Sequence, residues 1–356
     1  DILTYHKADV PEPSGPTMDL TATNIVIATG AKPRPLPGNP FAGALIDSTQ
    51  ALEVNEFPSS AVIIGAGAIA LEFASMWNAA GSKVTLLIRK DRVLSAWDRR
   101  AGTTLTRELK RHGVNIITRA SVTHVDTGAN LGATVHYTCE GQDGEQSVWG
   151  EIALVAIGRD PITDPAWGVT IDDHGHVATD AYGRTDKPGV WAVGDVTAGH
   201  ALAHRAFEQG IVIAETIAGL NPKPVDEATV PQIVFSFPEA ASVGLTVEQA
   251  QAREDLIEIK ETNYPMLANA RMLMSGTAGS LTIVSGCDAA NPDTPRVLGV
   301  HMVSQMASDI IAEAEQLVGN HVPLADAARL VHPHPTFSET LGEALLKADG
   351  RPLHTR

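Results

Sequence analysis

Short runs of β-branched and aliphatic residues recur along the first two thirds of the chain, and helical stretches separate them. Such runs cover residues 23–30, 61–64, 83–88, 114–117, 152–158 and 190–195. Apolar runs of this length that end near a glycine are typical of buried strands. Helices are predicted between them, from position 67 to Gly81 and over 103–112. Strands that alternate with helices predict a parallel sheet with right-handed crossovers.

The pattern changes twice further along. Residues 120–149 alternate with period two between glycine-rich turns, which predicts an antiparallel meander. A helix over 201–218 with Gly219 as its stop precedes the proline-containing linker 221–225. Beyond it, strands are expected near Ile233, Leu281 and Val297, with helices near Ser308 and Ser338. The sequence therefore predicts three units: a split first domain (1–57 and 151–225), an inserted domain (58–150) and an α+β domain (226–356).

Composition narrows the class of protein. The 356 residues include 26 Lys and Arg against 42 Asp and Glu, a net charge of −16, which argues against binding to a nucleic-acid backbone. The longest apolar run, 61–71, is too short for a membrane span of about 20 residues. Two cysteines cannot form a secreted disulfide scaffold. We therefore expect a cytoplasmic protein with no nucleic-acid or membrane partner.

A glycine-rich turn at 65–70 carries the first chemical signal. The sequence Gly-Ala-Gly-Ala-Ile-Ala follows a predicted strand and opens a predicted helix, the context that a dinucleotide fingerprint requires. Gly65 permits the tight turn, and Gly67 lets the backbone approach a pyrophosphate at the helix N-terminus. Ala70 takes the third position, where a small residue lets helix and strand pack. An ordinary βα turn is the alternative.

The end of the next strand bears on which nicotinamide dinucleotide binds. An NAD-specific unit places an acidic residue there for the ribose 2′-hydroxyl, whereas this chain has Arg89, Lys90, Asp91 and Arg92. Arginine can pair bidentately with a 2′-phosphate, so Arg89 and Lys90 favour NADP(H). In the alternative reading both cations are solvated and Asp91 binds the ribose of NAD.

Five motifs occur in one order, at 25–30, 65–72, 156–159, 193–195 and 332–336. In that order they resemble the flavin-dependent pyridine nucleotide disulfide oxidoreductases over essentially the whole chain. Residues 202–206 and the ending around 332–343 are most similar to bacterial dihydrolipoamide dehydrogenases, while positions 69–72 and 89–92 are more similar to glutathione reductase. The resemblance implies an α/β fold with Rossmann-like FAD- and NAD(P)-binding domains and a C-terminal α+β dimerisation domain.

The same resemblance assigns cofactor contacts. It places Thr29, Gly30 and Asp195 in the flavin site, and the backbone of Leu202 and Ala203 at the pyrimidine end of the ring. A second group belongs to the nicotinamide dinucleotide: Glu72 beside the flavin–nicotinamide contact, Gly158 and Val122 along the cleft, and Ile69 within the 65–72 turn. Core packing is an equal alternative for Val122.

The C-terminal stretch His-Pro-His-Pro-Thr at 332–336 supplies the catalytic candidates. A carboxylate that orients an imidazole makes a general acid/base pair, and His334 and Glu339 are the expected pair, with His332 in support. In the family this histidine protonates and deprotonates the substrate thiol and acts on the disulfide of the partner subunit. Taken alone, such a stretch is more often a rigid loop or an accidental metal-ligand pattern. The pair therefore predicts a homodimer with a dithiol/disulfide substrate, one candidate being a lipoyl domain of a multienzyme complex.

The family's redox cysteine pair and its first glycine fingerprint do not occur in the chain. Cys139 is expected on an alternating strand as a structural residue, and Cys287 in a turn between strands. The resemblance implies that the missing parts precede Asp1 and that this chain alone is inactive. Three functions stay open: a dihydrolipoamide dehydrogenase-type flavoenzyme, an NADPH-dependent glutathione- or mycothione-type reductase, and a non-catalytic dinucleotide-binding and dimerisation module.

Overall fold

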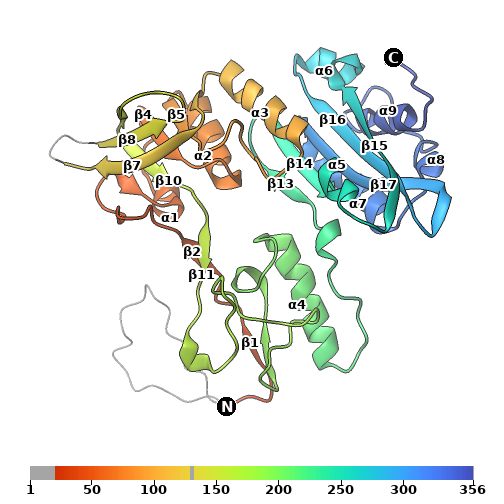
Figure 1. Ribbon diagram of the computed structural model, residues 1–356, viewed down its shortest axis with the longest axis horizontal. Helices are drawn as coiled ribbons and strands as arrows, with labels where there is room; N and C mark the ends of the chain where they lie inside the picture. Colours follow the sequence, from red (N-terminus) through yellow and green to blue (C-terminus); the bar gives the residue numbers. More distant parts are fainter. Residues whose placement is uncertain (1–20, 129–131, 356) are drawn as a thin grey trace. The chain divides into compact units, whose positions relative to one another are not determined.

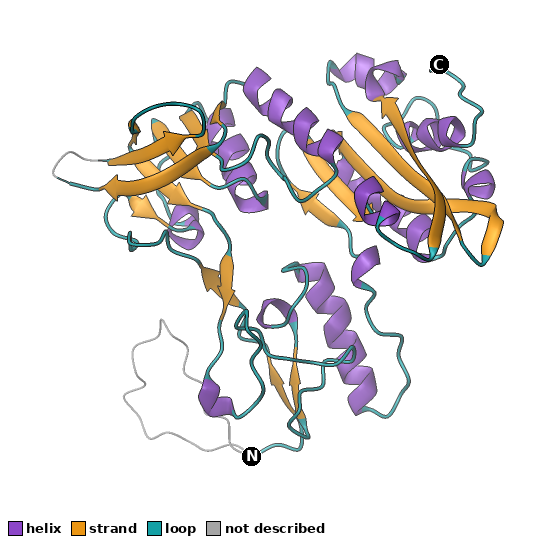
Figure 2. Cartoon of the chain, in the orientation of Figure 1, coloured by secondary structure: helices purple, strands orange, loops and turns teal. Residues whose placement is uncertain are grey.

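The computed structural model describes residues 21–128 and 132–355 (Figure 1). Their contacts divide the chain into two compact units. One unit combines the residues up to Lys32 with Arg159–Glu227, and the other combines Pro33–Gly158 with the residues from Ala228 onward. Helices and strands alternate in the first part of the larger unit, whereas long antiparallel strands dominate its last part (Figure 2).

The larger unit begins with a five-stranded parallel sheet in the order β3-β10-β4-β5-β6. Its strands are β3 (Leu45–Ile46), β4 (Ser60–Ile64), β5 (Lys83–Leu87), β6 (Asn115–Ile117) and β10 (Ile152–Val155), and its helices are α1 (Ser48–Leu52), α2 (Ala68–Ala79) and α3 (Arg99–Arg111). In register, Val62 pairs with both Ala153 and Thr85. The predicted parallel strands are thus confirmed, each within a few residues of its expected bounds.

Alternate residues of this sheet face two different layers. Ile63 and Leu86 pack with α2 and α3 in one core cluster, while Val62, Ile64 and Leu87 pack with the meander on the opposite face. Both faces are covered, as is usual for a parallel sheet. This explains why β4 is almost uniformly apolar rather than alternating.

The predicted helix over 103–112 is longer than expected. It begins at Arg99 because the Asp98 carboxylate accepts a hydrogen bond from the Ala101 amide at 2.8 Å, a side-chain cap. Lys110 and Arg111 occupy its last turn, where positive charge suits the helix dipole. The prediction placed the start too late because it followed the apolar positions and overlooked the cap.

The predicted meander over 120–149 is confirmed as three antiparallel strands: β7 (Ala120–Asp126), β8 (Ala133–Cys139) and β9 (Gln146–Gly150). A register shift lies between Val122 and His124 on β7. Val135, Tyr137 and Cys139 are buried on one face of β8, which confirms the structural role expected for Cys139.

The C-terminal part is a second five-stranded sheet, antiparallel, in the order β13-β14-β17-β16-β15. Its core packs against α7 and α9. The strands are β13 (Gln232–Val234), β14 (Glu239–Gly244), β15 (Leu256–Pro265), β16 (Ser280–Asp288) and β17 (Asn291–Ser304); the helices are α5 (Val247–Gln251), α6 (Ala270–Ser275), α7 (Ala307–Gly319), α8 (Leu324–Ala327) and α9 (Glu339–Ala348). The expected strands and helices of this part are all found.

The expectation for Cys287 is wrong. This residue lies inside β16, opposite Ile257 of β15, and it is fully buried. The glycine and aspartate around it indicated a turn, but Asp288 instead pairs with the Arg296 guanidinium across the β16–β17 hairpin at 2.8 Å. The turn begins only after Asp288.

The smaller unit contains a parallel pair of strands, β1 (Ile25–Ile27) and β12 (Val190–Ala192), and the helix α4 (Ala203–Ile217). β2 (Ala31–Pro33) pairs with β11 (Arg159–Pro161). The helix ends as predicted, because Gly219 takes a φ of +77° and its amide donates to the Thr216 carbonyl. No described helix combines the length and the apolar character that crossing a membrane requires.

Candidate active site

The carboxyl ends of β4, β5 and β10 border a cavity of about 700 Å³. Ligands of open parallel sheets bind at this end of the strands. Six of the residues predicted for cofactor binding line the cavity: Gly65, Gly67, Arg89, Lys90, Val122 and Gly158. The fold therefore brings together residues that are up to 93 positions apart in the sequence, and the cavity volume suits a large ligand.

Gly65 is required at its position for two reasons. Its φ is +141°, in the region that favours glycine, and an added Cβ would lie 2.2 Å from the Ala156 carbonyl oxygen and 3.4 Å from the Ala70 Cβ. Gly67 is the N-cap of α2 at a φ of −91° with open space around it. Because Gly67 supplies no side chain, no side-chain cap occupies the amides at the N-terminus of α2, which begins beside the cavity.

The other members of the turn serve packing. Ala70 is fully buried, and Ile69 packs against the same core cluster. The Glu72 carboxylate accepts a hydrogen bond from the Phe235 amide at 3.0 Å, so this side chain connects α2 to the segment after β13. None of the three lines the described cavity.

The four residues 89–92 after β5 separate into two pairs with different surroundings. Arg89 and Lys90 line the cavity and are exposed, and within residues 21–128 and 132–355 no carboxylate forms an ion pair with either. Asp91 instead pairs with Arg92 at 3.2 Å, and Arg92 also donates to the Ser95 carbonyl. The two cations therefore face the cavity, while Asp91 is held by its neighbour and is not among the lining residues.

The residues predicted for the flavin lie in the smaller unit. Val193, which follows β12, donates its amide to the Ile27 carbonyl of β1, so the segments that follow these two parallel strands emerge at one edge. Thr29 and Gly30 follow β1, and both bond to Ile162. Asp195 lies in a short 3₁₀ turn (Gly194–Val196) after β12. Leu202 and Ala203 begin α4, and Leu202 is its N-cap.

His334 and Glu339 form the predicted pair. The His334 Nδ1 and the Glu339 carboxylate are 2.6 Å apart; the imidazole is largely exposed, while Glu339 is 14% exposed. The Thr336 hydroxyl accepts from the Glu339 amide at 3.2 Å at the start of α9. The His334–Pro335 peptide is cis. The short loop and the first turn of α9 thus hold the imidazole against the carboxylate.

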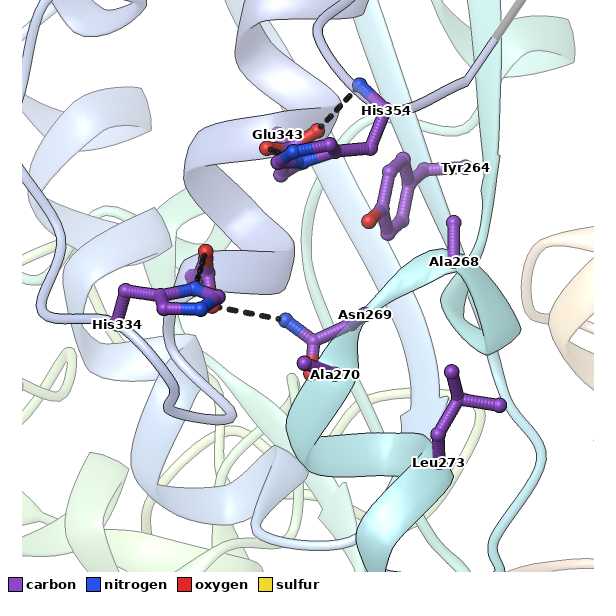
Figure 3. Close-up of a pocket in the computed structure, with 9 residues that line it drawn as sticks. Tyr264, Ala268, Asn269, Ala270, Leu273, His334, Glu343 and His354 are labelled. Atoms are coloured by element: carbon purple, nitrogen blue, oxygen red, sulfur yellow. Dashed lines mark hydrogen bonds and ion pairs between the residues drawn. The ribbon is translucent and has the colours of Figure 1, made fainter.

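The pair borders a pocket of about 180 Å³ whose other members the sequence did not indicate (Figure 3). The Asn269 amide donates to the second oxygen of Glu339 and to the Thr336 carbonyl, both at 3.3 Å. Glu343, one turn after Glu339 on α9, forms a further histidine–carboxylate pair with His354 at 2.8 Å. These residues converge from three segments, and no spacing along the chain reveals this. Asn269 alone carries a local signal, because it caps α6.

Tyr264 lies behind this pocket and is almost completely buried. Burial raises the pKa of its phenol, and the charges of Glu343 and Glu339 raise it further. The phenol therefore stays protonated across the physiological range. Its hydroxyl has no hydrogen-bond partner among the described residues.

His332 belongs to a different pair. Its Nε2 is 2.9 Å from the Glu313 carboxylate on α7, and its side chain is 9% exposed. The hydrogen bond to Glu313 raises the pKa of this imidazole, against the opposing effect of burial. His332 therefore anchors the loop that precedes His334 to α7, and among the described residues it forms no hydrogen bond with the His334–Glu339 pair.

Comparison with known proteins defines the class. The family described as pyridine nucleotide-disulphide oxidoreductase matches residues 3–210, and the dimerisation domain of the same family matches residues 230–345. Dihydrolipoyl dehydrogenase of Cupriavidus necator is 38% identical over 341 residues, which are 94% of this chain and 70% of that protein. The enzyme of the same name from Bacillus subtilis is 36% identical with the same coverage.

Solved structures agree with these relatives. A crystal structure of LpdA from Mycobacterium tuberculosis matches with a TM-score of 0.83 and 27% identity, over 94% of this chain and 72% of that one. The HOCl-induced flavoprotein disulfide reductase RclA from Escherichia coli matches with a TM-score of 0.81 and 26% identity, over 92% and 74%. The chain belongs to the pyridine nucleotide-disulphide oxidoreductase family, whose members depend on FAD and a nicotinamide dinucleotide.

Within this family the chain is a dihydrolipoyl dehydrogenase-like oxidoreductase. The predicted fold class is confirmed, since both a nucleotide-binding part and a dimerisation domain are present.

Proposed function

We propose that this chain takes part in electron transfer between a dithiol/disulfide of the lipoyl class and a nicotinamide dinucleotide, with FAD between them. The observation that carries the proposal is the presence of two sites in one unit. One is a cavity whose backbone is shaped for a dinucleotide around Gly65, and the other is the His334–Glu339 pair. In the domain assignment that goes with this proposal, residues 58–150 bind the dinucleotide together with β3 and β10, which complete their sheet. The remaining parts of 1–57 and 151–225 contribute to the flavin domain, and 226–356 form the subunit interface.

The dinucleotide fits the residues that are present. Gly65 lets the turn pack closely against Ala156, and the open space around Gly67 leaves room for a pyrophosphate at the N-terminus of α2, where amide donors are available. Gly158 and Val122 would border the remaining length of the cofactor. When bound, the dinucleotide exchanges a hydride with the flavin; this chain's part is to bind and orient it.

The dinucleotide that we propose is NADP(H). Arg89 and Lys90 line the cavity and carry no ion-pair partner within residues 21–128 and 132–355, while Asp91 is paired with Arg92. This arrangement supports phosphate binding more than ribose binding through Asp91. The resemblance to dihydrolipoamide dehydrogenases favours NAD instead, so NAD(H) is the alternative that the test below must exclude.

His334 is the proposed acid/base group. The Glu339 carboxylate, 2.6 Å from Nδ1, favours the tautomer in which Nδ1–H donates a hydrogen bond to it, and this tautomer leaves a lone pair on Nε2. That Nε2 can take the proton of a thiol as the thiolate forms and return it in the reverse direction. Glu339 orients the ring, and Asn269 in turn holds Glu339.

For the flavin we propose Asp195 beside its pyrophosphate side chain, Thr29 and Gly30 nearby, and the backbone of Leu202 and Ala203 at the ring. Glu72 is proposed near the flavin–nicotinamide contact. The parallel pairing of β1 and β12 supports the first part, since both following segments leave the same edge. We further propose a homodimer in the cytoplasm, for which the dimerisation-domain match is support, with a lipoyl domain as the dithiol carrier.

The test of the dinucleotide proposal is Arg89→Glu. The variant replaces a bidentate donor with an anion that repels a phosphate and can accept from a ribose hydroxyl. We expect the preference to invert from NADPH to NADH in binding titrations, because each charge-assisted contact is worth about 1.5–3 kcal/mol. Arg92→Gln is the matched control, since Arg92 pairs with Asp91. Equal changes for the two nucleotides would defeat the NADP(H) proposal.

Two alternatives to the proposed dihydrolipoyl dehydrogenase-type function can be distinguished from it by experiment. The cation pair at 89 and 90 favours an NADPH-dependent glutathione- or mycothione-type reductase, which turnover with those disulfides in place of lipoamide would identify. The chain by itself could instead be a dinucleotide-binding and dimerisation module without flavin. Flavin absorbance in the purified chain supports the electron-transfer proposal; colourless protein that binds NADPH supports the module.

Our prediction is that this chain alone does not turn over a disulfide substrate, and NADPH-dependent reduction of lipoamide by it would refute that.

A further inference from the structure

We propose that the β7–β8 hairpin carries a binding site for a divalent transition-metal ion, formed by His124, Asp126 and His136. The site lies on the meander (Figure 1), and all of its residues come from the two strands of one antiparallel pair. Among the described residues, these three ligand atoms form a group in which every atom lies within 4.8 Å of the others.

The register of the hairpin explains how the three side chains come to share a face. His124 pairs directly with His136, and Asp126 is two residues further along β7. Side chains two apart on a strand share a face, and direct cross-strand partners are neighbours on it. The register shift at Thr123 turns His124 and Asp126 outward while Val122 and Val125 remain half-buried. Without that shift, His124 and Val122 would lie on the same face.

The distances are close to those of a coordination shell. Asp126 Oδ2 lies 3.1 Å from His136 Nε2 and 3.8 Å from His124 Nε2, and the two rings stack with centroids 4.0 Å apart. Ligands of one zinc ion, each about 2.0–2.2 Å from the metal, lie roughly 3–4 Å from one another. Rotation of the exposed His124 and Asp126 side chains would bring the three ligand atoms, now within 4.8 Å of one another, to such separations. The exposure of His124 and Asp126, 47% and 65%, leaves room for a water ligand.

A second carboxylate lies on the other side of both rings, and this observation is independent of the first. Glu145 faces His136 Nδ1 at 3.6 Å and His124 Nδ1 at 3.9 Å, and its own position is fixed by the Thr123 hydroxyl at 2.7 Å. Metal-binding histidines commonly donate their other ring N–H to a carboxylate, which fixes the tautomer. Glu145 would do this for both rings and leave each Nε2 free to bind the ion.

The ligand set indicates the class of ion. Two imidazoles and one carboxylate suit Zn²⁺, Co²⁺, Ni²⁺ or Cu²⁺, whereas Mg²⁺ and Ca²⁺ prefer oxygen ligands. Histidine–carboxylate ion pairs without a metal are the competing explanation. These contacts by themselves predict no saturable metal binding.

The experiment measures Zn²⁺ binding by calorimetry at pH 7.5 on tag-free protein, with the Co²⁺ absorption spectrum as a second probe. We expect one ion per chain and a thermal midpoint that rises with Zn²⁺. His136→Gln and Asp126→Asn should each lower the affinity at least 100-fold. Glu145→Gln, which changes no ligand, should lower it 10- to 100-fold. The exposed positions allow each variant's fold to be checked by its melting curve without metal.

Two matched controls make the outcome decisive. His176→Gln removes another histidine that lies beside an aspartate, 3.4 Å from Asp172, and Cys139→Ser removes the thiol at the end of β8. Both should retain full Zn²⁺ affinity. Absence of stoichiometric binding, or binding that survives His136→Gln and Asp126→Asn, would overturn the proposal and leave only ion pairs. An unchanged affinity in Glu145→Gln would also contradict it.

Discussion

The dinucleotide cavity and the pocket beside His334 are built in opposite ways. The cavity of about 700 Å³ is shaped by backbone: a glycine with no room for a Cβ, a helix N-terminus and the ends of parallel strands. The pocket of about 180 Å³ is shaped by side chains, with His334, Glu339 and Asn269 joined by hydrogen bonds. A site made of backbone tolerates many side chains but no added atom at its tightest point, whereas a site made of side chains depends on each of their functional groups.

This difference determines what each site can be expected to do. Under the proposed function, the backbone site would bind a large ligand of constant shape and contribute geometry. The side-chain site would have to hold and release a proton, and an imidazole that is 62% exposed beside a carboxylate that is 14% exposed suits that task. Changes to the first site should therefore affect binding and folding, and changes to the second should affect rate.

The largest effect should follow from His334→Gln. Glutamine can occupy the space but cannot exchange a proton near neutral pH. In a flavin-loaded parent enzyme that carries the family's redox cysteine pair, dithiol–disulfide exchange should therefore slow by about 10²–10⁴-fold. Reduction of the flavin by the nicotinamide dinucleotide should be unchanged, because the dinucleotide cavity is not altered. Stopped-flow measurement of the two half-reactions separates these outcomes. Slowing of both half-reactions would contradict the separation of the two sites.

The next effect concerns the backbone site. Gly65→Ala places a Cβ 2.2 Å from a carbonyl oxygen at a φ of +141°, so we expect dinucleotide affinity to fall at least 100-fold and stability to fall by about 1–3 kcal/mol or more. Gly67→Ala meets nothing within 4 Å and should leave stability within about 0.5 kcal/mol. Urea unfolding and dinucleotide titration measure both. Equal destabilisation by the two variants would show that the tight approach at Gly65 is not the cause.

The sequence predicted the dinucleotide cavity more completely than the pocket beside His334, because the glycine turn of the cavity is built from consecutive residues and the pocket from distant ones. The cavity was predictable because strand, glycine turn and helix are consecutive, and Ala70 shows that packing required a small residue at the third position. His334 and Glu339 are five residues apart and were also found. Asn269, Tyr264 and His354 were not, because only tertiary packing brings the stretch 264–269 and the C-terminal His354 to the His334–Glu339 pair. Cys287 was misplaced because Asp288 signals a turn locally and instead pairs across a hairpin with Arg296.

A smaller effect should follow from loss of the Asn269 amide. This side chain caps α6 with its oxygen and holds Glu339 with its nitrogen. Asn269→Ser keeps a good capping group but cannot reach the carboxylate, so stability should change little. The rate of dithiol exchange should fall by about tenfold or less, since the lost bond is a single one to a charged group. Unchanged exchange with wild-type stability would show that Asn269 only caps its helix.

The smallest effect is a dependence of stability on pH through His332. The hydrogen bond to Glu313 raises the pKa of this imidazole in the folded protein, so the protonated form is favoured by folding. The resulting stabilisation is fully present below the unfolded pKa of about 6.5 and is lost as the pH rises through the higher folded value. His332→Gln should therefore cost more at pH 5.5 than at pH 8.5, by on the order of 1 kcal/mol in urea unfolding. Glu313→Gln should show the same dependence because it removes the same interaction.

His332 also lies against Gly342, where an added Cβ would be 2.3 Å from the ring, so glutamine will disturb packing at every pH. A cost that is constant with pH would therefore assign His332 to packing alone, and a cost that declines with rising pH would assign it to the ion pair that holds the loop before His334.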